Sequence, residues 1–157
     1  MDTAVELDFA DGRYRFWLPM PQVIELERKC GQRDEHGVLR PKSIVTIFDG
    51  LNDSLGMQDD KLVWLGGGAI FPGDVNEVLR LGLIGGGTVE GPVAARELVE
   101  SYGYPARPLV EVAGLAWAVL SAAVLGISIK KKEPEPDQPT AAAPSADKPM
   151  SRSKKGQ

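Results

Sequence analysis

The chain has 157 residues, 43% of them hydrophobic, and a formal net charge of −4 at pH 7, which is enough length for one domain with its own core. Residues 1–129 carry 11 Lys/Arg against 18 Asp/Glu, a net of −7, whereas residues 130–157 carry 7 against 4, a net of +3. An acidic body gives little reason to expect nucleic acid as a partner, and a short basic run is usually solvated.

Residues 5–18 alternate between apolar and polar side chains on either side of an Asp11-Gly12 turn. Asp-Gly favours a two-residue β-hairpin turn, because both positions readily adopt positive φ. Counting outward from this turn gives three pairs on one apolar face, namely Phe9 with Tyr14, Leu7 with Phe16, and Val5 with Leu18. On the other face Asp8 is predicted to lie opposite Arg15, so apolar and charge patterns agree on a hairpin.

Two amphipathic helices are expected next. The first has Val23, Leu26 and Cys30 on its inward face and ends at Gly31. Residues 31–42 are polar and are predicted to form a loop. The apolar positions of the second helix are Ile44, Ile47, Phe48, Leu51 and Leu55. Residues 56–73 are predicted to be irregular, with a short strand at 62–65.

A third helix is predicted from Val75 to Ile84. Its inward face is formed by Val75, Val78, Leu79 and Leu83. Three glycines at 85–87 should end it, because each costs about 1 kcal/mol in a helix interior. Gly85 suits a left-handed cap. No Lys-Ser/Thr pair follows these glycines, so they do not form a phosphate-binding loop.

Two further helices complete the pattern. The fourth starts near Pro92, which suits a first turn, and its buried positions are Ala95, Leu98, Val99 and Tyr102. The last is expected at 109–129, of which residues 112–129 are uncharged. Eighteen residues span about 27 Å, just short of a bilayer core of about 30 Å. The segment therefore fits either a membrane anchor or a buried core helix, and the core is favoured because the amphipathic helices need something to pack on.

These elements predict an α+β fold that is mostly helical. We expect an N-terminal β-hairpin packed on a small bundle of four to five helices, together forming one compact domain at 1–129. Residues 130–157 are rich in Pro, Ala, Ser and Lys and have almost no bulky apolar residues. Such a segment cannot offset the entropy of ordering, so a disordered C-terminal tail is predicted.

No constellation of residues indicates catalysis, a cofactor or a metal. The one histidine, His36, is predicted to be a surface residue in a polar loop, and the acidic pairs near Asp49 and Asp59 lack the spacing of a calcium loop. Cys30 is the only cysteine, so we expect a small core residue in a reducing cytoplasm. Residues 1–7 lack the features of a signal peptide.

Four residues are candidates for partner binding. Trp17 is predicted on the polar face of the hairpin, where it is either an interface anchor or an ordinary edge-strand residue. The other three, Val78, Arg80 and Leu81, belong to the third helix, whose apolar surface suits helix-in-groove contact.

The order of elements resembles that of a small protein family of gene transfer agents and tailed-phage gene clusters. Its members are described as tail tube or tail assembly chaperone-like components. The likeness rests on the hairpin followed by a helix with Leu26-Glu27, on residues 78–87, and on residues 108–111 leading into 115–120. It covers most of residues 4–129.

The resemblance implies a non-enzymatic chaperone for a long non-contractile tail. Its expected partners are the tape-measure protein and the tail-tube protein, with neither nucleic acid nor a membrane as partner, and self-association is left open. The alternatives are a structural tail-tube component that stays in the particle and a small protein anchored in a membrane by residues 112–129.

Overall fold

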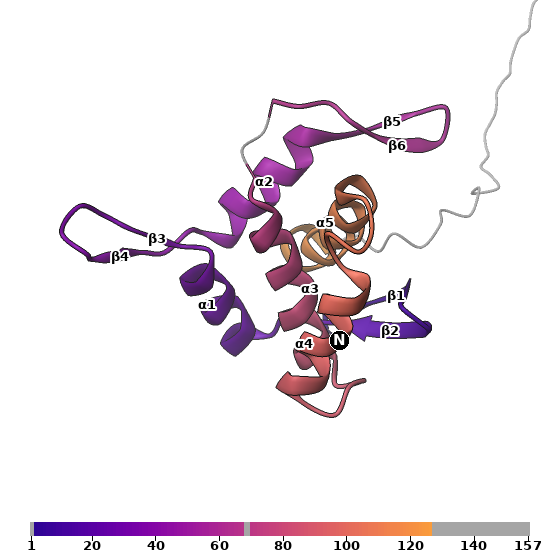
Figure 1. The fold of residues 1–157 in the computed structure, drawn as a ribbon, viewed down its shortest axis with the longest axis horizontal. Helices are drawn as coiled ribbons and strands as arrows, with labels where there is room; N and C mark the ends of the chain where they lie inside the picture. Colours follow the sequence, from indigo (N-terminus) through magenta and orange to yellow (C-terminus); the bar gives the residue numbers. More distant parts are fainter. Residues whose placement is uncertain (1, 68–69, 127–157) are drawn as a thin grey trace, which may run out of the picture.

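The computed structural model describes residues 2–67 and 70–126, and the predicted tail at 130–157 lies outside these residues. The helices are α1 (Met20–Lys29), α2 (Ile44–Ser54), α3 (Pro72–Gly86), α4 (Pro92–Tyr102) and α5 (Leu109–Leu125). The strands form three separate antiparallel hairpins, β1 (Val5–Phe9) with β2 (Gly12–Phe16), β3 (Gln32–Arg33) with β4 (Leu39–Arg40), and β5 (Leu55–Gln58) with β6 (Lys61–Trp64). The mostly helical α+β fold with an N-terminal hairpin is therefore confirmed (Figure 1).

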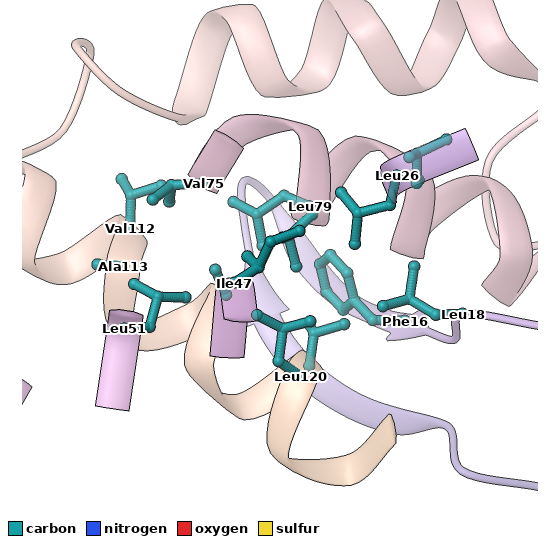
Figure 2. Close-up of a cluster of buried hydrophobic side chains, with 14 of the residues drawn as sticks. Phe16, Leu18, Leu26, Ile47, Leu51, Val75, Leu79, Val112, Ala113 and Leu120 are labelled. Carbon is teal, nitrogen blue, oxygen red and sulfur yellow. The ribbon is translucent and has the colours of Figure 1, made fainter. Parts of the chain in front are cut away.

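Helices α3 and α5 form the centre of the fold. Helix α3 packs against α1, α4, α5 and β2, and α5 also packs against α2 and the β5–β6 hairpin. In Figure 2 the side chains of Phe16, Leu79 and Leu120 point toward one another between these elements, and all three are fully buried. Burial of such side chains is the main stabilising contribution, at about 2 kcal/mol for each.

Helix α5 is covered by its own domain over most of its length. Its buried residues are Val112, Ala113, Ala116, Ala118, Val119, Leu120, Ser121 and Ala122. It ends at Leu125, four residues before the predicted end, because Gly126 adopts a left-handed cap with φ 73°. Among the described helices none has both the length and the apolarity needed to cross a bilayer.

The register of the N-terminal hairpin differs from the prediction by two residues. Val5 pairs with Phe16 and Leu7 with Tyr14, so the two-residue turn is Ala10-Asp11. A shift of two residues keeps every side chain on its predicted face. The charge pair across the hairpin shifts as well. The Asp8 carboxylate is bound by the Arg13 guanidinium at 2.9 Å, and not by Arg15 as predicted.

Tertiary contact with α3 explains this shift. The backbone N–H of Trp17 donates to the carbonyl oxygen of Gly82 at 3.0 Å, so the chain leaves β1 after Phe16 and runs along the helix. Leu18, which the sequence pairs with Val5, is instead buried beyond the end of β2.

The C-terminal end of α3 also differs from the prediction, which placed the cap at Gly85. The helix continues through Gly85 and Gly86, and the left-handed cap is Gly87 with φ 76°. A Cβ on Gly85 would overlap the carbonyl oxygen of Trp17, and one on Gly86 would overlap that of Arg15. These two glycines therefore allow the backbone at Arg15 and Trp17 to approach α3 closely. They do not end the helix.

Two segments predicted as irregular contain hairpins. Residues 31–42 form β3 and β4 around a turn in which the Asp34 carboxylate accepts hydrogen bonds from the backbone N–H of His36 at 2.8 Å and of Val38 at 2.9 Å. The bond from Val38 is the main cause that holds the pKa of Asp34 below its usual value. Residues 56–73 include most of the β5–β6 hairpin, of which only the strand near 62–65 was expected.

Ser121 is a weak point of the core. Its side chain is fully buried in α5, and its hydroxyl has no hydrogen-bond partner in the part of the chain that the structure describes. We expect Ser121→Ala to raise the free energy of unfolding by about 1 kcal/mol, because an unsatisfied buried hydroxyl is removed. Urea unfolding measures the change.

Ser54 supplies the matched control for this prediction. It is equally buried in a helix, but its hydroxyl donates to the carbonyl oxygen of Gly50 at 2.8 Å. Ser54→Ala should therefore lower the free energy of unfolding by about 1 kcal/mol. If both variants lost the same free energy of unfolding, the Ser54 and Ser121 hydroxyls would not differ in hydrogen bonding as the structure shows.

Candidate functional site

The β5–β6 hairpin carries a concentration of exposed apolar side chains. Met57 is 66% exposed, Leu62 40%, Trp64 44% and Leu65 64%. We call these four residues the hairpin apolar surface. Single exposed apolar residues are ordinary, whereas several on one short element indicate a binding surface.

The local sequence explains how this hairpin forms. Asp59 and Asp60 have φ of 54° and 63°, as a two-residue turn with two left-handed positions requires. Leu55 pairs with Trp64 and Met57 with Leu62. Since alternate residues of a strand share a face, Leu55, Met57, Leu62 and Trp64 lie on one side of the hairpin. Leu65 lies on the other side, where its side chain would meet a Cβ on Gly56.

The hairpin is fixed to the helices at its base, and Leu62, which lies nearer the turn, also packs on α5. Leu55 is buried, the backbone N–H of Leu65 donates to the carbonyl oxygen of Ser54 at 2.7 Å, and Leu62 lies where a Cβ on Gly114 of α5 would be. The other end projects beyond α5 (Figure 1). The helical core therefore holds the hairpin in place while most of its apolar side chains remain open to solvent.

Four exposed acidic residues lie on the hairpin turn and on the helix that precedes the hairpin. Asp49 and Asp53 are exposed on α2, and Asp59 and Asp60 are exposed at the hairpin turn. None of these carboxylates lies within 4.0 Å of a cationic group in residues 2–67 and 70–126. With Lys61 as the only cation, residues 49–65 carry a net charge of −3.

Two of the residues proposed from the sequence for partner binding are inaccessible. Val78 is 0% exposed and Leu81 is 2% exposed, so neither offers a surface contact, and this part of the prediction is corrected. The reason is that α3 is covered on several sides, by α1, α4, α5 and β2. Its apolar side chains therefore face the core.

Trp17 and Arg80 are only partly buried. The Arg15 guanidinium lies over the Trp17 ring, 5.3 Å from its centroid, an arrangement that holds the ring against the protein. Arg80 donates to Glu77 at 2.9 Å and 2.7 Å, and this bond raises the pKa of the guanidinium. The structure therefore does not bring these two residues together with the hairpin apolar surface.

Arg80 lines an open cleft of about 430 Å³ between α1, α3 and α4. The cleft wall carries cations of Lys29, Arg80 and Arg96 together with carboxylates of Glu77 and Glu100. Charges of both signs nearly balance there, and no reactive group accompanies them. The cleft is thus a weaker candidate than the hairpin.

His36 and Cys30 lie where the sequence predicts them. His36 is exposed at the turn between β3 and β4, and Cys30 is 3% exposed beside α1. No group of three His, Cys, Asp or Glu side chains within the described residues is arranged to hold a metal ion.

The thiol of Cys30 should be unreactive in the folded protein. Desolvation by burial, with a smaller effect of Asp74, raises the pKa of Cys30, and only the thiolate reacts rapidly. At pH 8 we expect labelling by a thiol reagent to be at least about a hundredfold slower than in urea, because labelling requires local or global opening. Labelling is followed by absorbance. Equal labelling rates in the folded protein and in urea would contradict the burial of Cys30.

Sequence reasoning missed the hairpin apolar surface, although a signal was present. Residues 55–58 and 61–64 are related by apolar alternation around Asp59-Asp60, and Asp tolerates positive φ better than most residues. The pair lacks the glycine of a typical hairpin turn, so the signal was weaker than that of Asp11-Gly12.

Comparisons of the chain with protein-family models, curated proteins and solved structures find no match.

Proposed function

We propose that the chain is a non-enzymatic assembly chaperone for a long non-contractile phage-type tail, acting in the cytoplasm on the tape-measure and tail-tube proteins. The observation that carries this proposal is the hairpin apolar surface, four large side chains that are at least 40% exposed on an element anchored to a well-packed core. The resemblance of residues 78–87, 108–111 and 115–120 to chaperone-like tail components supports it. The proposed work is binding, with no chemical step.

The need for such a chaperone follows from the properties of the tape-measure protein. A tape-measure protein is long and helical, and its apolar stripes are exposed before the tail tube encloses them. Transient contact with the exposed side chains of Met57 and Trp64 would shield such a stripe from self-association. Because aromatic and methionine side chains contribute strongly to small interfaces, a short hairpin is sufficient for reversible binding.

Co-expression tests the proposal. The wild-type chain should keep the tape-measure protein in the soluble fraction, and a double variant, Met57→Ser with Trp64→Ser, should lose this effect while it remains folded. Val93→Ser is the matched control, since Val93 is 58% exposed on α4, away from the hairpin. An unchanged insoluble fraction with and without the wild-type chain would contradict the proposal.

A structural tail-tube component and a chaperone differ in where the chain is found after assembly. A tail-tube component stays in the particle, whereas a chaperone leaves it. Mass spectrometry of purified particles should therefore find the tail-tube protein in full and this chain absent or strongly depleted. Recovery at the tail-tube protein's copy number would favour the structural role.

A further inference from the structure

We propose that an apolar groove beside Trp17 binds residues 127–129 of the same chain, which follow the described part of α5. The groove has a volume of about 540 Å³ and lies between the beginnings of α1 and α2 and the last turn of α5. Its walls include apolar side chains from all three helices, namely Val23, Ile44, Val45, Ala123 and Val124. The inference is independent of the proposed chaperone function, which concerns the β5–β6 hairpin.

The groove suits an apolar occupant. Val45 is 49% exposed and Met20, which also lines the groove, is 65% exposed. Asp2 is the only charged residue among the described residues that line it, and its carboxylate is paired with the Arg15 guanidinium. The groove therefore offers no free charge to a ligand, and an apolar segment that covers it removes exposed apolar surface from water.

The described part of the chain ends beside this groove. Val124 lines the groove, and Gly126 ends α5 in a left-handed conformation with φ 73°. An apolar residue that follows such a glycine frequently packs on the last turn of the helix, and Ile127 occupies this position. Three extended residues span about 10 Å, so residues 127–129 start next to the groove and can reach into it.

The sequence of this segment matches the groove. Ile127 and Ile129 are separated by Ser128, so both isoleucine side chains would lie on the same side of an extended segment. Three lysines follow at 130–132, and no other bulky apolar residue occurs before Met150. The two isoleucines therefore form the apolar part of the segment, and the lysines would remain in water beyond the groove.

The same segment of a second copy is a weaker occupant. Ile127 is three residues from Val124 in the same chain, and a connection this short gives an effective concentration in the millimolar range. A second copy competes only at its own concentration in solution. Docking within one chain would also cover Trp17, and it would fix the place where the three lysines leave the domain.

Nuclear magnetic resonance of the full chain, with labelled isoleucine and valine methyl groups, tests the inference. Nuclear Overhauser cross-peaks are expected from Ile127 and Ile129 to Val45 in the groove. None are expected to Val93, which is 58% exposed on α4. A mixture of labelled and unlabelled chains shows whether the cross-peaks arise within one chain or between two.

A serine variant measures what the isoleucines contribute. The amide order parameter S² of residues 127–129 should be about 0.8 in the wild-type chain and below about 0.6 in Ile127→Ser with Ile129→Ser. The backbone resonance of Val45 should shift in this variant, while that of Val93 stays in place. The control, Ala141→Ser with Ala142→Ser, introduces two serines farther along the chain and should change neither the order parameter nor the resonances.

Three results would each overturn the inference. They are the absence of cross-peaks from Ile127 and Ile129 to the groove, cross-peaks only between labelled and unlabelled chains, and an order parameter as low in the wild-type chain as in the isoleucine variant. None of them affects the chaperone proposal, whose test depends on Met57 and Trp64.

Discussion

Replacing Gly86 with alanine is expected to lower the free energy of unfolding by about 3 kcal/mol, because the added methyl group would overlap the carbonyl oxygen of Arg15. The obstructing atom belongs to the β2 backbone, which cannot rotate away as a side chain end can. Alanine is favoured over glycine in a helix by about 1 kcal/mol, so a measured loss would show that close packing of β2 on α3 outweighs helix propensity. Urea unfolding followed by circular dichroism gives the value.

Gly73 provides the control in the same helix. It lies in the first turn of α3, and a Cβ there would meet no atom within 4 Å. Gly73→Ala should therefore be neutral or stabilising by up to about 1 kcal/mol. Similar effects of the Gly73 and Gly86 substitutions would contradict the close contact between α3 and β2.

The second large effect is expected for Phe16→Ala, at about 4 kcal/mol of lost stability. Phe16 is 0% exposed and makes an edge-to-face contact with Phe9, with ring centroids 5.9 Å apart. It also lies against Gly82 of α3, so truncation leaves a cavity between hairpin and helix. Thermal and urea unfolding both report the loss.

Phe71→Ala is the matched control for this truncation. Phe71 is 50% exposed and precedes α3, where the Lys42 ammonium lies 5.0 Å from the ring centroid. Its removal should cost about 1 kcal/mol. A Phe16 variant as stable as the Phe71 variant would show that the hairpin does not belong to the core.

Periodicity was sufficient to predict the helices and the faces they bury. The spacing of Val75, Val78 and Leu79 places all three on the inward face of α3, where the structure finds them fully or almost fully buried. The same holds for Leu26 in α1 and Leu51 in α2. These positions are predictable because a buried face leaves a repeat of 3.6 residues in a single segment.

Features set by contacts between distant segments were not predictable. The hairpin register depends on the hydrogen bond from Trp17 to Gly82, and the end of α3 depends on backbone atoms of Arg15 and Trp17 that approach Gly85 and Gly86. Asp11-Gly12 and Gly85 carry strong local signals for a turn and a cap. In both places tertiary packing outweighed the local preference.

The candidate site shows the same limit. Val78 and Leu81 were proposed for partner binding because an amphipathic helix considered alone offers an apolar surface. In the folded chain its neighbours cover that surface, whereas Met57 and Trp64 are exposed on a hairpin whose turn lacks glycine. Exposure depends on what packs on an element, and the sequence of that element does not contain this information.

We propose that the chain works by binding a partner through the β5–β6 hairpin. Hydrogen exchange of the chain alone and in complex with the tape-measure protein tests it most directly, since an isolated two-stranded hairpin exchanges rapidly. We predict that residues 55–65 become strongly protected in the complex, while residues 92–102 of α4 exchange at an unchanged rate. Protection confined to α4 or to other elements, with the hairpin exchanging as in the free chain, would contradict the claim.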